Sequence, residues 1–314
     1  MSELLCQALS SFGLEGAEAA FLQHNENLIY RIHDAYLLRI HSPAPGVYAP
    51  CTIENRHAEL AFLAHLNDHG MIVQQPQSTP SGDLVALLPD GTAATLLRWL
   101  PGQVVSGKDY TPEMCFRAGR MTAALHQAAA GFTHPGLRAY DEADVHDKAE
   151  LLTAMVQRHQ LGDEHAGILR AACEAVAQSF ATSQDAPIAI HDDLSPSNIL
   201  QTEDGLVPID FSLCGIGLPM TDLGMLLAGF NSTAQRSAAV RGYQAAGGVL
   251  RHREMEAGFI HGLLGAFVFH ADTWPKEPWF PARLIRWENE MLLPFAQGKP
   301  ILDDEMNFLY LPTT

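Results

Sequence analysis

A short polar run between apolar pieces constrains this chain more than any other feature. The run reads His-Asp-Asp-Leu-Ser-Pro-Ser-Asn over residues 191–198 and follows the apolar residues 188–190 directly. A second apolar piece, residues 207–209, ends at Asp210. Apolar runs this short, bounded by turn-forming residues, predict β-strands. The chain is therefore expected to place polar side chains directly after each of two short strands.

The spacing H-x-D-L-x-x-x-N, followed by an aspartate after a strand, suits phosphoryl transfer. In that reaction a divalent cation bridges the phosphates and is held by hard oxygen ligands. A separate carboxylate accepts or orients the proton of the attacking hydroxyl. We therefore expect Asp193 in the position of the base, and Asn198 and Asp210 as ligands of Mg²⁺.

The texture of the chain changes after Pro101 and Gly102. Before this point, short apolar runs broken by turn residues predict hairpins over residues 28–40 and 84–100, with a helix over 53–66 between them. After it, apolar residues recur mainly at helical spacing. We predict an α+β fold in two parts, a small β-rich part with one helix (1–100) and a larger, mostly helical part (101–314).

Charge and cysteine content exclude several classes of protein. Lys and Arg number 19 and Asp and Glu 36, a net charge of −17, which argues against nucleic-acid binding and would tolerate a cationic small ligand. The five cysteines are scattered and suit neither a disulfide framework nor a zinc site. Since we find no signal peptide and no apolar stretch long enough to span a bilayer, we expect a cytoplasmic protein without a membrane partner.

The run I-H-D-D-L-S-P-S-N-I-L, followed by P-I-D-F and by Thr-Asp-Leu at 221–223, resembles the aminoglycoside phosphotransferase family. That family includes choline kinase-like and homoserine kinase-like enzymes and shares a bilobal fold with protein kinases. The resemblance implies an ATP- and Mg²⁺-dependent kinase that phosphorylates a hydroxyl of a small molecule, such as an aminoglycoside, homoserine or a choline-like amino alcohol. It also implies that lobe 1–100 binds the nucleotide and that lobe 101–314 binds the acceptor and carries the catalytic residues.

Weaker matches in the first lobe imply further nucleotide-binding residues. By resemblance, Asn27 lies in the hairpin that covers ATP, Arg39 is the phosphate-binding base with Glu59 as its partner, and Leu97 and Trp99 lie in the hinge. The family's lysine is missing, because none of the four lysines precedes residue 108. A guanidinium is always charged and can bind phosphate through two nitrogens, so Arg39 is a reasonable substitute. Its only competitors in this lobe are the other arginines, Arg31, Arg56 and Arg98.

Three residues around the central motif are expected to support it. By resemblance His191, which we group with the catalytic residues, braces the loop near Asp210. Asp222 either caps a helix after Thr221 or bonds back to the catalytic loop. Asp192 is expected to point to solvent or to the substrate, and solvent is the favoured interpretation.

Alternatives remain open at this point. Trp274, Trp279 and Trp287, with acidic neighbours, either hold an amine or pack helices together. A protein Ser/Thr kinase has the same fold, but only eleven residues separate Asp210 from Asp222 and no A-P-E motif occurs. A nucleotide-binding pseudokinase is a third reading, kept open by the missing lysine. The acceptor, the preference for ATP or GTP and the oligomeric state do not follow from the sequence.

Overall fold

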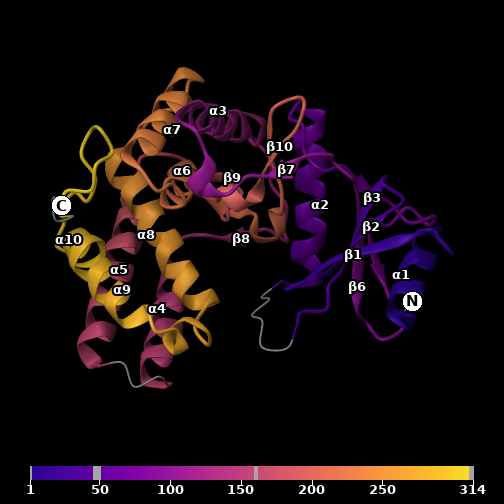
Figure 1. The fold of residues 1–314 in the computed structure, drawn as a ribbon, viewed down its shortest axis with the longest axis horizontal. Coiled ribbons are helices and arrows are strands. Elements are labelled where there is room, and N and C mark those ends of the chain that lie inside the picture. Colours follow the sequence, from indigo (N-terminus) through magenta and orange to yellow (C-terminus); the bar gives the residue numbers. More distant parts are fainter. Residues whose placement is uncertain (1, 45–50, 159–161, 311–314) are drawn as a thin grey trace.

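The computed structural model describes residues 2–44, 51–158 and 162–310. Figure 1 shows a β-rich lobe formed by the first third of the chain, with long helices gathered on the other side of the molecule. The predicted two-lobed α+β architecture is confirmed. One difference is that the N-terminal lobe carries two helices, α1 and α2, where the sequence predicted one. No helix among the described residues has both the length and the apolar character needed to cross a bilayer.

The N-terminal lobe is an antiparallel sheet in the order β1-β2-β3-β6-β4, with β5 paired to β6. Both predicted hairpins are present, whereas β1 was missed because most of its side chains are exposed and show no alternation. The unpredicted α1, capped by the Ser2 side chain, packs Leu5 and Leu9 against one face of this sheet. The strands are β1 (Ala19–His24), β2 (Leu28–Ile32), β3 (Tyr36–Ile40), β4 (Pro76–Gln77), β5 (Val85–Leu87) and β6 (Ala93–Arg98), and α1 is Glu3–Ser11.

Helix α2 (Ile53–Asp68) covers the other side of the lobe and begins at a capping box formed by Thr52 and Asn55. Its first turn is tied to the second lobe, because the Asn55 side-chain amide donates to the carbonyl of Gly136 at 2.9 Å. Just before the helix, the Cys51 thiol donates to the Ser212 carbonyl at 3.2 Å. These contacts hold α2 against the second lobe and so fix the residues on its inner face.

The second lobe is built mainly of packed helices. At the crossing of α3 and α7, Gly119 has no room for a side chain, since an added Cβ would lie 1.9 Å from the Ala239 carbonyl oxygen. Between α9 and α10 lies a π-helical turn (Glu288–Leu292), which is followed by Pro294, a residue that cannot donate a helical hydrogen bond. The helices are α3 (Pro112–Ala128), α4 (Glu142–Arg158), α5 (Asp163–Ala181), α6 (Pro219–Ala228), α7 (Thr233–Ala245), α8 (His252–Phe269), α9 (Phe280–Trp287) and α10 (Leu293–Ala296).

Two small sheets carry the loops between the lobes. Strands β7, β10 and β11 form one, and β8, β9 and β12 form the other. The two predicted strands are β9 and β11, and β10 follows the polar run directly. The strands are β7 (Gln103–Val104), β8 (Arg138–Ala139), β9 (Ile188–Ile190), β10 (Ile199–Gln201), β11 (Leu206–Pro208) and β12 (Gly215–Gly217).

Candidate active site

The loop between β9 and β10 places Asp193 and Asn198 beside Asp210. Strands β10 and β11 pair antiparallel, and the Ile209 amide donates to the Asn198 carbonyl at 2.9 Å, which brings Asp210 next to the loop. The Asn198 side-chain amide donates to the Asp193 carboxylate at 2.7 Å and to the Asp193 carbonyl at 2.9 Å. The structure therefore brings together the three residues that the sequence predicted as base and metal ligands.

The carboxylates in this site repel one another. Burial and the neighbouring Asp210 raise the pKa of Asp193 to about 8, although the hydrogen bond from Asn198 opposes this shift. A carboxyl group with such a pKa holds its proton more readily than an ordinary aspartate and is poised to exchange it near neutral pH. Asp193 thus has both the position and the electrostatic surroundings of a group that handles a proton.

Asp210 and Asn198 fit a hard divalent cation. The Oδ1 atom of Asp210 is buried and has no hydrogen-bond partner among the described residues. Because the Asn198 side-chain nitrogen is bound to Asp193, its amide oxygen is left to act as a ligand. Asp210 adopts a left-handed backbone conformation (φ 61°), a strained state for an aspartate that occurs often at functional sites. Carboxylate and amide oxygens are the ligands that Mg²⁺ and Ca²⁺ accept.

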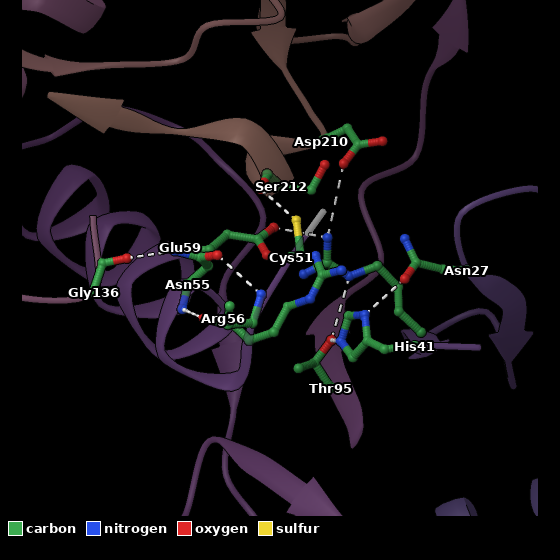
Figure 2. A network of polar contacts seen from close by, with 12 residues as sticks. Asn27, His41, Cys51, Asn55, Arg56, Glu59, Thr95, Gly136, Asp210 and Ser212 are labelled. Carbon is green, nitrogen blue, oxygen red and sulfur yellow. Dashed lines mark hydrogen bonds and ion pairs between the residues drawn. The ribbon is translucent and has the colours of Figure 1, made fainter. Parts of the chain in front are cut away.

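A buried ion pair lies beside this site in the N-terminal lobe. Arg39 on β3 donates from Nη1 to Glu59 Oε1 on α2 at 2.7 Å, and both side chains are at most 3% exposed. The same nitrogen lies 3.9 Å from Asp210 Oδ1, while Nη2 of Arg39 is buried and has no hydrogen-bond partner within the described ranges. Burial would lower the pKa of Arg39, but Glu59 outweighs it and raises the pKa, so the guanidinium stays charged. Figure 2 shows this network, with Asp210 facing it from the opposite loop.

A chain of hydrogen bonds joins Arg39 to Asn27. Burial, helped by Arg56 and Arg39, holds the pKa of His41 well below its usual value, so its ring is neutral and has one donor. Arg39 Nε donates to the Thr95 hydroxyl at 3.3 Å, and that hydroxyl lies 3.1 Å from His41 Nε2. His41 Nδ1 then donates to the Asn27 side-chain oxygen at 2.7 Å. The predicted lid residue Asn27 is therefore buried and anchored to Arg39.

His41 and Thr95 were missed by the sequence analysis. Thr95 lies in a predicted strand, and a buried threonine needs a polar partner. That partner, Arg39, lies beside Thr95 through the pairing of β3 with β6. Their pairing depended on a strand register that the sequence did not fix.

Asp222 holds the loop that carries Asp193 through buried hydrogen bonds. Its carboxylate, which is fully buried, accepts from the backbone amides of His191 and Asp192 at 3.0 and 2.9 Å and contacts His126 Nε2 at 3.2 Å. The helix-cap interpretation is wrong, because α6 begins at Pro219 and Asp222 lies inside it. The alternative of a bond back to the loop is the one observed.

His191 and Asp192 are also held from beneath the loop. His191 is buried and its Nε2 lies 2.9 Å from the Ile209 carbonyl, so the ring links the two site loops without reaching their open side. The prediction that Asp192 faces solvent is wrong. Asp192 is 5% exposed, its carboxylate lies 3.2 Å from His261 Nε2 on α8, and its backbone is left-handed (φ 55°).

The two predicted hinge residues, Leu97 and Trp99, differ in their burial. Leu97, one residue before the end of β6, is fully buried and is paired with Leu37 on β3 and with Pro76 on β4. The Leu97 side chain therefore packs inside the N-terminal lobe, and its contact with a nucleotide stays a prediction. Trp99 comes directly after the strand, is only partly buried, and is covered by the Arg31 guanidinium at 4.8 Å.

The tryptophan-rich segment packs helices together. The rings of Trp274 and Trp287 lie against Phe267 on α8, with centroids 5.5 and 5.3 Å away. The cation over Trp279 and Trp287 is the protein's own Arg283, at 5.6 Å from each ring. Of the two interpretations of this segment, the geometry favours packing.

Comparison with known proteins agrees with this arrangement. The sequence model of a group described as "Phosphotransferase enzyme family" matches residues 19–258. An amicoumacin kinase of Bacillus subtilis (strain 168) is 22% identical over 236 residues, which cover 72% of this chain and 67% of that protein. Among solved structures, amicoumacin kinase hAmiN in complex with AMP-PNP, Ca²⁺ and Ami superposes with a TM-score of 0.74 at 17% identity, over 98% of this chain and 95% of the other. A microcompartment-associated aminopropanol kinase gives 0.74 at 18% identity, over 97% and 98%.

Proposed function

This chain belongs to the phosphotransferase enzyme family, and from that premise we propose that it transfers the γ-phosphoryl group of ATP to a hydroxyl of a small molecule with the help of Mg²⁺. The observation that carries the proposal is the meeting of Asp193, Asn198 and Asp210 in one site, 3.9 Å from the buried Arg39–Glu59 pair at its nearest point. The resemblance in the sequence and the relatives reported above support the same chemistry.

Each residue has a role that follows from its position. Asp193 would orient the acceptor hydroxyl and take its proton, for which its raised pKa is suited. Asn198 and Asp210 would hold Mg²⁺, which neutralises charge on the phosphates. The unpartnered Nη2 of Arg39 would donate to a phosphate oxygen, while Glu59 and Thr95 keep the guanidinium in place. Such catalysis consists mainly of positioning and charge stabilisation.

The acceptor is a small molecule in this proposal, not a peptide. Between Asp210 and Asp222 the chain forms a 3-10 turn (Phe211–Leu213), β12 and the start of α6, which leaves no long segment to bind a peptide. We propose an alcohol that also carries an amine, a class suggested by the names of the relatives and by the net charge of −17. All five cysteines are free, which suits the reducing cytoplasm where ATP is abundant.

A panel of acceptors tests the proposal. ADP release would be followed with aminoglycosides, amino alcohols, homoserine, choline and simple sugars, with and without Mg²⁺, and the product would be examined by mass spectrometry for one added phosphoryl group. We expect release that needs both Mg²⁺ and an amine-bearing alcohol. Tight binding of Mg-ATP with no product from any acceptor would favour the pseudokinase alternative, and no binding of ATP would contradict the proposal.

A further inference from the structure

The nucleotide side of the site contains more buried positive charge than Glu59 can neutralise. Arg39 and Arg56 are 3% and 4% exposed, and Glu59 between them is 1% exposed. Arg39 holds one Glu59 oxygen at 2.7 Å, but Arg56 Nη1 lies 3.8 Å from the other, too far for a hydrogen bond. Among the described residues, Arg56 Nη1 has no hydrogen-bond partner at all.

Within the described part of the chain, Glu59 is the one carboxylate that forms an ion pair with Arg56. His41 is neutral, since the two arginines and burial lower its pKa. A third arginine, Arg138 on β8, donates to Cys51 at 2.9 Å, so it adds positive charge beside the start of α2. Asp210 lies 3.9 Å from Arg39, but the proposed function needs it for a cation. Buried guanidinium groups are stable only when anions pair with them.

We propose that Arg56 is a second phosphate-binding arginine, which acts with Arg39 on the polyphosphate chain of the nucleotide. This inference rests on the proposed function. Arg39 directs Nη1 to Glu59 and Nε to Thr95, and among the described residues its Nη2 has no hydrogen-bond partner. Arg56 stands one helical turn before Glu59 on the same inner face of α2 and carries an unused donor. Two arginines would thus bind the phosphates in a lobe (residues 1–100) that contains no lysine.

A carboxylate on the lid turn supports this assignment. The pKa of Glu26, in the turn between β1 and β2, lies above its usual value, because burial and Asp210 outweigh the opposing effects of Arg56 and Arg138. An acidic side chain of the protein's own therefore lies in the field of these arginines, in the part of the site where phosphate would enter. Phosphate, with more charge and more acceptor oxygens, is expected to displace it.

Nucleotide affinity, measured by calorimetry without any acceptor, tests the role of Arg56. The ligands are ATP, ADP, AMP and adenosine, and the variants are Arg56→Met, Arg56→Lys and, as matched control, Arg241→Met on the exposed surface of α7. We expect Arg56→Met to weaken ATP binding about 10- to 100-fold, because a charge-assisted hydrogen bond is lost. Adenosine binding should be unchanged, the loss should grow from AMP to ATP, and Arg56→Lys should recover part of it. Arg241→Met should behave as wild type.

A double variant separates phosphate binding from mere support of Glu59. If Arg56 only neutralises Glu59, Arg56→Met/Glu59→Gln will bind ATP as well as Glu59→Gln alone, and the inference is overturned. If Arg56 binds phosphate, the double variant will be weaker by about the same factor of 10 to 100. Equal loss for adenosine and ATP would also overturn it. Failure of the wild-type protein to bind ATP would instead contradict the proposed function itself.

Discussion

Replacing Asp222 by asparagine removes the negative charge that holds the backbone of the loop at His191 and Asp192. One carboxylate oxygen accepts from the His191 amide and contacts His126 Nε2, and the other accepts from the Asp192 amide. Asparagine has one acceptor oxygen and one NH₂ group, so at least one buried donor must face another donor. The better orientation keeps the oxygen toward His191 and His126 and leaves the Asp192 amide unpaired.

The magnitude follows from these contacts. An unpaired buried amide costs about 1–3 kcal/mol, and each of the two remaining bonds loses about 1 kcal/mol when its acceptor is no longer charged. The expected loss in the free energy of unfolding is therefore about 3–5 kcal/mol. The assay is urea unfolding at neutral pH, with Asp304→Asn as control, since the Asp304 side chain is fully exposed and should change stability by less than about 0.5 kcal/mol.

The same variant makes a prediction about pH. Burial alone would raise the pKa of Asp222, but hydrogen bonds from His126 and the loop outweigh it and lower the pKa below its usual value. A carboxylate whose pKa is lowered in the folded state stabilises the protein at pH values above its pKa in the unfolded state. This contribution is lost as the pH falls through the pKa of the folded state. The stability gap between wild type and Asp222→Asn should thus be constant near neutrality and narrow below about pH 4. A loss under about 1 kcal/mol, or a gap that does not narrow in acid, would refute the reasoning.

Two further variants test the packing and the polar chain. Gly119→Ala should destabilise the protein by about 3 kcal/mol or more, because the new Cβ meets the Ala239 carbonyl oxygen at 1.9 Å, whereas Gly167→Ala, with open space around its Cβ, should stabilise α5 by about 0.5–1 kcal/mol. Equal effects in urea unfolding would contradict this account of the α3–α7 crossing. Thr95→Val removes the hydroxyl between Arg39 and His41 and should cost about 1–3 kcal/mol. Unchanged stability and ATP affinity in that variant would show that the hydrogen bonds through Thr95 do not support Arg39.

The sequence predicted those parts of the molecule that depend on local pattern. Hairpins and helices followed from apolar periodicity, and Asp193, Asn198 and Asp210 met because short strands flank them in the chain. Arg39 and Glu59 were paired by resemblance, and their ion pair is present. Their catalytic and binding roles stay predictions until measured.

Contacts between distant segments were not predictable in the same way. Asp192 was assigned to solvent because its partner, His261, lies 69 residues further along the chain. Asp222 was assigned in part to a helix cap because the start of α6 at Pro219 depends on the turn before it. In each case tertiary packing decided between two uses of one side chain.

Comparing Asp193→Asn with the wild type tests the central claim most directly. With an acceptor that supports turnover, kcat for ADP release and the affinity for Mg-ATP would be measured for both proteins. The account predicts that kcat falls by at least about 100-fold, since the carboxylate that takes the hydroxyl proton is gone, while Mg-ATP affinity stays within about threefold. Turnover equal to that of the wild type would contradict the assignment of Asp193 as the base.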